Sequence, residues 1–410
     1  IQAVYRYVQF TKDIKFLDEL HLIPETGGKK RSVYDTLKAI IHYSSKISIG
    51  QHGLPLIDYA DWNDCLKVDS DYLLGKDKEN LTGPIDHYSE SVMNAFLLKI
   101  AMLYMKELAS QVNDQEYESE LEKSINDLSN SLQLHGWKED FYARVLFNRY
   151  GNEITYLGAK NDGFSNDENI DGTYFINSFS WSIISEEATE SQIEIMVDRI
   201  EKYLKKPFGF ALMSPTDLSK ISKVTATGEY FPGDRENGGI FKHASMMAAF
   251  AMIKAAKEVT NPELAERLRN MAYWMVDKVF PYHTLNDPYA LCGNPRWCTQ
   301  YINSNTGEHI GPTLSGTSTW LTLTLFEMLG IEYRGNKLLL NPMLAEEVEV
   351  MKFSIKYLDS HYSFSIHKPK GLYRVKDCKY TLIMDQQVLE NNTVDLINDG
   401  KQHTIEMKFE

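Results

Sequence analysis

The spacing of apolar residues changes near residue 330, and this change constrains the fold more than any other feature of the chain. Before it, apolar side chains recur every three to four residues, as between Val92 and Leu103, which is the period of an amphipathic helix. After it, residues 351–357 and 362–367 alternate apolar and polar side chains, which is the period of a strand. We therefore predict a mainly α-helical part followed by a small β domain.

The helical part is expected to carry its function on loops. Long polar loops cover residues 160–171 and 283–315, and loops of this kind on a rigid scaffold often carry binding sites. No repeat of about 20–50 residues is visible, although antiparallel helix pairs can close into a toroid without one. Helices are predicted at residues 33–41, 92–103, 116–134, 138–149, 190–205, 238–258, 262–279 and 317–330.

Charge and composition narrow the choice of partner. A formal charge of −14 disfavours nucleic acid and anionic lipid, so a neutral ligand is expected. The four cysteines form no close-spaced pair and no metal motif, and no run of 18 apolar residues or signal-like start is present. These features predict a cytoplasmic chain without a metal or a membrane span. The chain starts at Ile1 inside a helical pattern, which suggests a fragment of a longer protein.

The first chemical motif is Asp61-Trp62-Asn63-Asp64, which follows a turn rich in Gly and Pro. A Trp offers a stacking face for a sugar ring, and it also forms an apolar wall that raises the pKa of a neighbouring carboxylic acid. Such an acid can protonate a glycosidic oxygen. A helix N-cap beside a core Trp explains the same four residues equally well.

The second and third motifs lie at predicted helix starts. Residues 233–244 contain Arg235, Glu236 and His243, and a helix N-terminus with a His donor suits an oxyanion such as phosphate. Residues 311–320 bring small hydroxyl residues and Gly316 to another helix start. Ordinary capping explains each of these motifs when it is taken alone. Two such helix starts in one chain favour an anion site.

Together these motifs resemble the inverting disaccharide and oligosaccharide phosphorylases of glycoside hydrolase family 94. The resemblance spans nearly the whole chain. It is carried by Gly53-Leu54-Pro55-Leu56, Asp61-Trp62-Asn63-Asp64, Glu90-Ser91-Val92, Arg235-Glu236-Asn237-Gly238-Gly239, His243-Ala244, Ser315-Gly316-Thr317, Trp320 and Leu329-Gly330-Ile331.

The resemblance implies an (α/α)6 barrel over residues 1–332, incomplete at its N-terminus, and a C-terminal β-sandwich over residues 333–410. It implies that Asp64 is the general acid of an inverting phosphorolysis, which needs inorganic phosphate as co-substrate and no cofactor. It also allows a homodimer, since relatives often form one. By the same resemblance, Trp62 and Glu236 bind the sugar, and His243, Ser315 and Gly316 hold the phosphate. We add neighbouring residues as candidates, with Asn63, Arg235 and Gln300 for the sugar and Thr317 for the phosphate, and the loop at 291–304 that carries Gln300 could line the acceptor site or only cross the barrel mouth.

The chain also departs from the family pattern. The family's N-terminal β-sandwich, linker and first barrel helices have no counterpart in this sequence. The segment Asn177-Ser178-Phe179-Ser180-Trp181 stands where an Asp and a Gln are expected, which leaves the identity of one subsite open.

Several functions therefore stay open. The acid and anion loops look most similar to the branch that acts on β-1,2-glucooligosaccharides, with cellobiose-type or laminaribiose-type phosphorylases as alternatives. A rival enzyme is an inverting hydrolase with Asp234 or Glu236 as base. The same residues are compatible with a non-catalytic glucan-binding fragment and with the phosphorylase-like domain of a cyclic β-1,2-glucan synthase.

Overall fold

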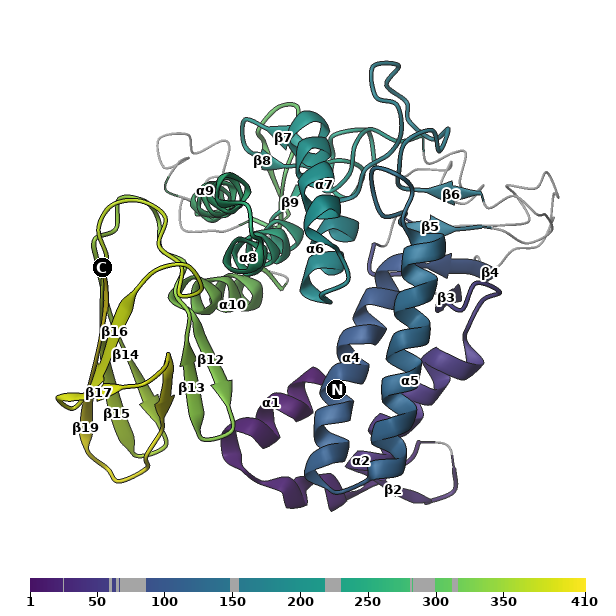
Figure 1. Cartoon of the computed structure of the whole chain (residues 1–410). Coiled ribbons are helices and arrows are strands. Elements are labelled where there is room, and N and C mark those ends of the chain that lie inside the picture. The colour runs from purple at the N-terminus through teal and green to yellow at the C-terminus, as the bar shows by residue number, and fades with distance from the viewer. Residues whose placement is uncertain are drawn as a thin grey trace.

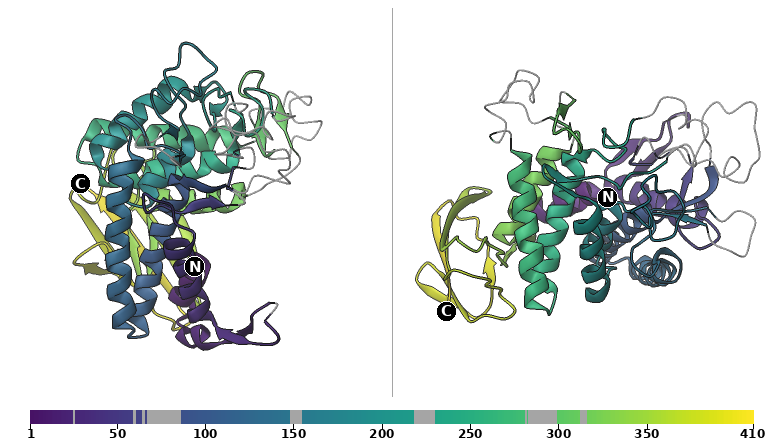
Figure 2. Two further views of the ribbon diagram at one scale, coloured as in Figure 1. Left: turned by 90° about the vertical axis from the view of Figure 1, so that its right-hand side faces the viewer. Right: turned by 90° about the horizontal axis from the view of Figure 1, so that it is seen from above.

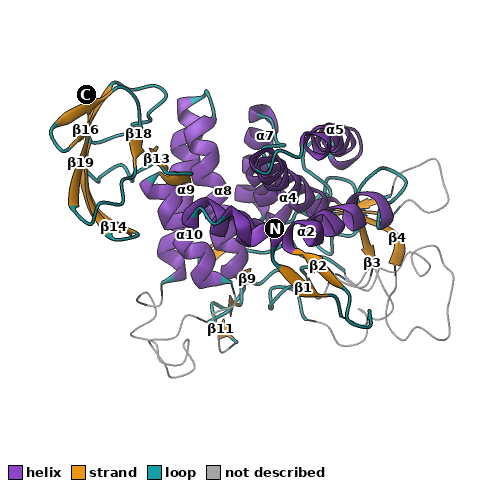
Figure 3. Ribbon diagram, turned by 90° about the horizontal axis from the view of Figure 1, so that it is seen from below, coloured by secondary structure: helices purple, strands orange, loops and turns teal. Residues whose placement is uncertain are grey.

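The computed structural model confirms the order of helices followed by strands. It describes residues 1–24, 26–58, 61–63, 66, 86–147, 155–217, 230–280, 282, 299–311 and 316–410. The helices form one group between strands β3 (Leu56–Asp58) and β4 (Asp86–Ser91) on one side and the C-terminal sheets on the other (Figures 1 and 3). They are α1 (Gln2–Thr11), α2 (Val33–His42), α4 (Val92–Gln111), α5 (Gln115–Ser131), α6 (Ile176–Ile184), α7 (Glu190–Tyr203), α8 (Lys242–Glu258), α9 (Pro262–Val279) and α10 (Thr317–Leu329).

Four of these helices lie side by side in the order α4, α6, α8 and α10, and α5, α7 and α9 pack against their predecessors in the chain. Most residues of α6 and α8 are buried. Helix α8 is rich in Ala and Met, and small side chains let neighbouring helices approach closely while Met fills the remaining gaps. Its buried small residues include Ala248, Ala249, Ala251, Ala255 and Ala256.

The N-terminal ends of the side-by-side helices gather at one end of the group. The first backbone N–H groups of α4, α6 and α8 donate to the carbonyl oxygens of Arg144, Leu212 and Gln300 at 3.2, 3.0 and 3.1 Å. Leu212 in turn donates its N–H to the carbonyl of Gly239, just before α8. Short strands and loops at this end therefore hold three helix starts together.

Short antiparallel sheets cover the same end, in the orders β3-β4-β5-β6 and β9-β10-β11. The helix predicted at residues 138–149 is wrong for the described residues 138–147. There the chain turns between Trp137 and Tyr142 and enters strand β5, because its buried residues satisfy their backbone groups across strands. These strands are β3 (Leu56–Asp58), β4 (Asp86–Ser91), β5 (Val145–Leu146), β6 (Tyr156–Leu157), β9 (Ile240–Phe241), β10 (Tyr301–Ile302) and β11 (His309–Ile310).

The predicted helix at 238–258 begins later than expected, at Lys242. Gly238 has a φ of 87°, which a helix cannot accommodate, and β9 pairs with β10 before α8 starts. The predictions at 116–134, 190–205, 262–279 and 317–330 agree with α5, α7, α9 and α10 to within a few residues at either end. Two small hairpins complete this part, β1 (Leu20–Leu22) with β2 (Lys30–Ser32) and β7 (Lys205–Lys206) with β8 (Gly209–Phe210).

Two sheets with a shared apolar core follow α10. One has the order β12-β13-β18 and the other β14-β15-β19-β16-β17, and β15 and β19 pair in parallel. Leu338 and Val394 of the first sheet and Phe364 and Met407 of the second belong to one buried cluster. Seen from above, the sheets lie on one side of the helices (Figure 2). Their strands are β12 (Ile331–Arg334), β13 (Lys337–Leu340), β14 (Val350–Tyr357), β15 (Ser360–His367), β16 (Tyr380–Met384), β17 (Gln387–Leu389), β18 (Thr393–Asp395) and β19 (Gln402–Phe409).

The helices and sheets are joined by buried arginines and one required glycine. Gly330 ends α10 with a φ of 71°, and a Cβ there would lie 2.0 Å from the carbonyl carbon of Asn341. The fully buried Arg269 of α9 donates to the carbonyl of Gly371 at 3.0 Å. Arg374 donates to the carbonyl of Val259 at 2.6 Å, just after α8. The sheets are thus fixed to the C-terminal end of α8 and to the N-terminal half of α9.

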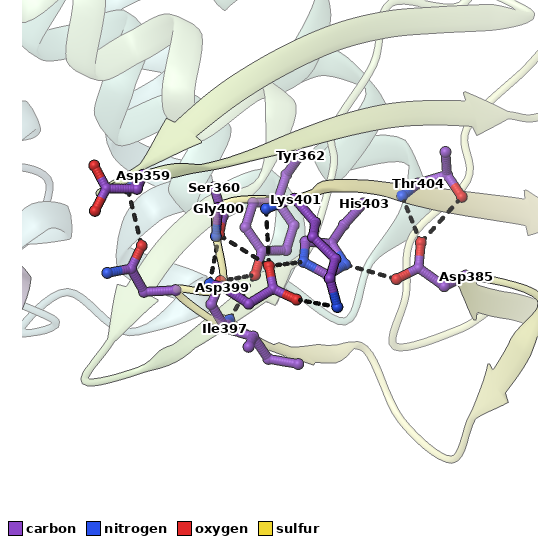
Figure 4. Close-up of polar contacts among 11 residues, drawn as sticks. Asp359, Ser360, Tyr362, Asp385, Ile397, Asp399, Gly400, Lys401, His403 and Thr404 are labelled. Carbon is purple, nitrogen blue, oxygen red and sulfur yellow. Dashed lines mark hydrogen bonds and ion pairs between the residues drawn. The ribbon is translucent and has the colours of Figure 1, made fainter.

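A histidine between two carboxylates lies near the start of β19, the central strand of the larger sheet (Figure 4). His403 of β19 contacts Asp385 through Nδ1 at 2.6 Å and Asp399 through Nε2 at 3.1 Å, and Tyr362 stacks on its ring. The hydrogen bond with Asp385 raises the pKa of His403, and the same bond lowers the pKa of Asp385. The backbone N–H of Lys401, together with His403, lowers the pKa of Asp399 to about 2.

This cluster predicts a pH-dependent stability. Because the folded-state pKa of His403 is raised, its charged form stabilises the fold below about pH 6.5, and this contribution is lost as the pH rises through the folded-state pKa. The carboxyl contributions are lost as the pH falls below about 4, since the pKa values of Asp385 and Asp399 are lowered. We expect His403→Gln to lower Tm by about 2 °C near pH 5.5 and by less near pH 9.

Thermal unfolding followed by circular dichroism measures both values. His361→Gln, at an exposed position on the neighbouring strand β15, is the matched control. An equal loss of Tm at both pH values would contradict a charge-dependent role for His403.

Candidate functional site

Trp62 and Asn63 of the first motif lie at the N-terminal end of α8. The indole of Trp62 stacks on Phe241 with ring centroids 5.1 Å apart, and it meets the imidazole of His243 edge-on at 5.5 Å. Asn63 is buried, and its backbone N–H donates to Asp61 Oδ1 at 3.0 Å. Asp64, the expected acid, lies outside the described residues. The structure therefore brings the first and second motifs together through Trp62 and His243.

Asp61 is held by a buried arginine that the sequence did not single out. Arg144 Nη1 donates to Asp61 Oδ2 at 3.1 Å and Nη2 contacts Oδ1, and neither side chain is exposed to solvent. Ser91 Oγ also donates to Asp61 Oδ2 at 3.3 Å. The turn that carries Trp62 is thus tied to the start of α4, where Ser91 is the N-cap.

Glu90 holds the turn that precedes the first motif. Its buried carboxylate accepts the backbone N–H groups of His52 and Leu54 at 3.0 and 3.1 Å and pairs with the His52 ring. A Cβ on Gly50 would lie 2.2 Å from the Glu90 side chain, so a glycine is required there. Two segments that the family resemblance singled out, at residues 53–56 and 90–92, are therefore joined by direct contact.

The second motif places Glu236 and Arg235 differently. Glu236 is buried, and Tyr301 donates its hydroxyl to Glu236 Oε1 at 3.4 Å. Arg235 has a left-handed backbone with a φ of 41°, and its half-exposed guanidinium lies 3.7 Å from Asp234 and over the ring of Tyr230. Glu236 thus faces the aromatic residues of the site, while Arg235 contacts its own loop.

His243 is the point where the second and third motifs meet. Burial lowers the pKa of His243 to about 4, so its imidazole is neutral at pH 7. Gly316, at the start of α10, packs on this ring so closely that a Cβ there would lie 2.3 Å from Nε2. The next residue, Thr317, is buried, and its Oγ1 has no hydrogen-bond partner among the described residues. Ser315 lies outside the described residues.

A stack of three aromatic rings supports the site, and sequence reasoning found only its first member. Phe241 of β9 and Tyr301 of β10 are register partners with ring centroids 4.4 Å apart, and Trp62 stacks on Phe241. Gln300, which precedes Tyr301, accepts the N–H of Lys242 through its carbonyl and packs its Cβ near Gly311. A strand is recognised in a sequence by alternating apolar and polar residues. Strands β9 and β10 have two residues each, which is too few to show this pattern.

The arrangement offers an aromatic face beside two helix starts of a kind that suits an anion. A planar indole backed by a second ring suits the apolar face of a sugar. The starts of α8 and α10 meet at His243 and Gly316, and helix starts carry partial positive charge that attracts an anion. In the part of the chain that the structure describes, no group of three His, Cys, Asp or Glu side chains is placed to bind a metal ion. No described helix is both long and apolar enough to span a bilayer.

The contact between Gly316 and His243 is testable by substitution. The φ of Gly316 is −66°, so Gly316→Ala introduces no backbone strain and acts only through the methyl group that meets the imidazole. We expect the displaced ring to become more exposed and its pKa to rise from about 4 toward about 6.5. Titration of the histidine NMR signals measures this change.

His243→Gln assigns the signal, and Ser318→Ala, at an exposed position of α10, controls for a general effect on the helix. An unchanged titration midpoint in Gly316→Ala would show that the two residues do not press on each other in solution.

Comparison with known proteins finds relatives that are phosphorylases by name. The chain is 24% identical over 379 residues to the N,N'-diacetylchitobiose phosphorylase of Vibrio furnissii, which covers 91% of this chain and 42% of that protein. It is 22% identical over 415 residues to the solabiose phosphorylase of Paenibacillus borealis, covering 99% of this chain and 48% of that protein. The chain thus spans less than half the length of these relatives.

Two further similarities concern a longer relative and a solved structure. The cyclic beta-(1,2)-glucan synthase NdvB of Rhizobium meliloti (strain 1021) is 27% identical over 340 residues, covering 79% of this chain and 10% of that protein. A solved sialidase structure superposes with a TM-score of 0.52 at 12% identity, covering 79% of this chain and 27% of that one, which is a likeness of fold.

The family comparison is decisive because it covers most of the chain. Residues 1–329 match the model of the glycosyl hydrolase 94 superfamily catalytic domain, and these residues include all three motifs and every helix described above. The chain therefore belongs to the glycosyl hydrolase 94 superfamily.

Proposed function

We propose that the protein catalyses inverting phosphorolysis of a β-glucoside, with Asp64 as general acid and inorganic phosphate as nucleophile. The observation that carries this proposal is the meeting of Trp62, His243 and Gly316, three residues from three separate motifs, at the N-terminal ends of α8 and α10. A sugar-stacking ring beside an anion site is the arrangement that attack of phosphate on a sugar requires.

The phosphate is held by His243, Gly316, Thr317 and Ser315. A neutral imidazole and a buried hydroxyl donate hydrogen bonds to the dianion, and the helix starts add partial positive charge. Because burial lowers the pKa of His243 to about 4, this residue carries no full positive charge at pH 7. Bound phosphate would supply the charge that favours a proton on the imidazole.

The reaction needs one protein carboxyl group. An inverting hydrolase requires a second carboxylate to activate water, whereas the phosphate dianion is a nucleophile that only has to be positioned. Asp64 gives its proton to the glycosidic oxygen as that oxygen leaves. A phosphate oxygen forms the new bond to the anomeric carbon from the opposite face, which yields α-glucose 1-phosphate and a shortened glycan.

The sugar is bound by Trp62, Asn63, Arg235, Glu236 and Gln300. Glu236 is buried beside the hydroxyl of Tyr301, and a carboxylate in this position accepts hydrogen bonds from sugar hydroxyl groups. Arg235 remains half-exposed and lies against Tyr230, so it would reach a glycan from the rim of the site.

The glycan we propose is a β-1,2-glucooligosaccharide. The acid loop, the loop at 298–304 and the anion loop at 311–317 look most similar to the branch that acts on this linkage. The similarity to a cyclic beta-(1,2)-glucan synthase supports the choice. Other relatives carry names with different linkages and sugars, so cellobiose-type and laminaribiose-type substrates are the main alternatives.

The proposed setting follows the family resemblance. Residues 1–332 would form part of an (α/α)6 barrel and residues 333–410 a β-sandwich, consistent with the change from helix to strand at Gly330. The enzyme would use phosphate as co-substrate without another cofactor, in the cytoplasm, and a homodimer is the assembly we would look for first.

The proposal predicts phosphate-dependent release of α-glucose 1-phosphate from β-1,2-glucooligosaccharides. Asp64→Asn should lower this rate on the order of a hundredfold or more, because the leaving oxygen then lacks its proton donor. Coupled assay of the released phosphosugar, with and without inorganic phosphate, measures both effects. Asp359→Asn, at an exposed position after β14, is the matched control.

Release of free sugar without phosphate would assign the protein to hydrolases that use Asp234 or Glu236 as base. Near-normal turnover by Asp64→Asn would refute the assignment of the acid. Sugar binding without turnover by the unaltered chain would favour a glucan-binding role.

The reverse reaction tests the linkage. With α-glucose 1-phosphate as donor, we expect faster phosphate release with sophorose as acceptor than with cellobiose, because the acceptor hydroxyl must reach the anomeric carbon in line with the leaving phosphate. Phosphate release at matched acceptor concentrations measures the preference. A preference for cellobiose would reject the β-1,2 assignment while leaving phosphorolysis intact.

A further inference from the structure

The buried pair of Arg144 and Asp61 joins the sugar-binding turn to a fixed part of the scaffold. Both side chains are fully buried, and the guanidinium grips the two carboxylate oxygens in a forked arrangement. This pair connects positions 83 residues apart in the sequence. Asp61 lies directly before Trp62 and Asn63 in the chain, so the position of Asp61 determines the positions of these two residues.

Arg144 is held firmly on its own side. Its backbone N–H donates to the carbonyl of Leu157 at 2.6 Å, and its carbonyl accepts the N–H of Val92, the first residue of α4. Gly158 has a φ of 115°, and a Cβ there would lie 2.4 Å from the backbone nitrogen of Arg144. The guanidinium lies over the ring of Phe175 at 6.0 Å. Arg144 is therefore fixed from several directions.

Asp61 uses its two oxygens for different tasks. Oδ1 accepts the backbone N–H of Asn63 at 3.0 Å, which closes an Asx turn around Trp62. Oδ2 accepts from Ser91 Oγ at 3.3 Å, and Ser91 Oγ itself caps α4 by accepting the N–H of Asn94 at 3.1 Å. The carboxylate therefore couples the shape of the turn to the start of a helix.

Stability alone does not explain such a pair. A fully buried ion pair gains little over two well-packed apolar side chains, because both charges lose their hydration. Its advantage is geometric. The forked contact with Arg144 and the hydrogen bond from the Ser91 hydroxyl fix the distance and the orientation of the Asp61 carboxylate. The residue whose place it fixes is Trp62, which stacks on Phe241 and meets His243.

We propose that Arg144, acting through Asp61, is the positioning residue for the sugar-binding turn at Trp62 and Asn63. The inference rests on the proposed function for the identity of the ligand, while the positioning of the turn itself does not depend on it. Arg144 itself contacts neither the sugar nor the phosphate. It fixes the indole relative to the anion site at His243.

The first test measures the turn directly, by amide hydrogen exchange of the unaltered chain and of Arg144→Met. We expect exchange at Asn63 to become about tenfold faster or more, because its acceptor is no longer held, while exchange within α8 stays unchanged. Lys99→Met is the matched control. Lys99 pairs with Glu187 at 2.6 Å in a similarly buried ion pair, about two turns further along α4 from Ser91.

Equal acceleration at Asn63 in Arg144→Met and Lys99→Met would overturn the proposal, since both variants would then act through general destabilisation. Unchanged exchange at Asn63 in Arg144→Met would overturn it as well. Either result is independent of whether the protein has phosphorylase activity.

The second test separates positioning from stability. Asp61→Asn keeps the oxygen that accepts the Asn63 N–H but leaves Arg144 buried without a charge partner, so Tm should fall. Asp61→Asn with Arg144→Met removes that unpaired charge, so Tm should largely recover. We expect kcat/KM for the glucan to stay about a hundredfold low in the double variant, with the KM for phosphate little changed.

Arg144→Lys keeps the charge without the fork, and we expect it to restore Tm more than kcat/KM for the glucan. Recovery of kcat/KM together with Tm in the double variant would show a purely structural role and reject the inference. If the unaltered chain lacks phosphate-dependent release, the proposed function fails, and affinity for the glucan then replaces kcat/KM as the readout in the same variants.

Discussion

The packing of α8 between α6 and α10, with α9 against its outer side, is the contact on which the site depends. Helix α8 is buried along most of its length, and its Ala and Met residues allow three helices to approach it. Because α6, α8 and α10 lie side by side with their starts at one end, the loops before them converge. Residues 62, 243 and 316 become neighbours only through this packing.

The electrostatics at this end follow from burial. Two carboxylates near the first motif have partners within the protein, because Asp61 pairs with Arg144 and Glu90 accepts the backbone N–H groups of His52 and Leu54. His243 is neutral because burial lowers its pKa. The helix starts then supply partial positive charge in surroundings where little water is present to screen it. Such partial charge attracts an anion without requiring a charged imidazole at His243.

The sequence predicted helices and strands best where the same spacing of apolar residues is repeated several times. Helices α5, α7, α9 and α10 and the alternating strands β14 and β15 belong to this class. The prediction failed at residues 138–147, because apolar residues in a short buried strand pair mimic a helix face over one or two turns. Local periodicity cannot distinguish these cases, since the deciding hydrogen bonds come from residues distant in sequence.

The sequence predicted the motif residues of the candidate site but not the residues that hold them in place. Trp62, Glu236, His243 and Gly316 stand in segments whose composition indicated a sugar or an anion. Arg144 carries no such signal, because it lies among buried aromatic residues and its partner is 83 positions away. Only the fold reveals that pairing.

Cationic side chains from the C-terminal sheet region interact with the C-terminal end of α8, which is the end opposite to the candidate site. Arg374 donates to the carbonyls of Ala256 and Val259, and Lys376 donates to that of Glu258, so cations from the sheet region cap the helix C-terminus. Within α8 itself, Lys257 bonds to Glu327 of α10 at the same end. These cations satisfy carbonyls at the C-terminus that would otherwise be buried and unpaired, while the N-terminal part of the helix lies against Gly316. The sheets thus fix the axis of the helix whose other end forms the site.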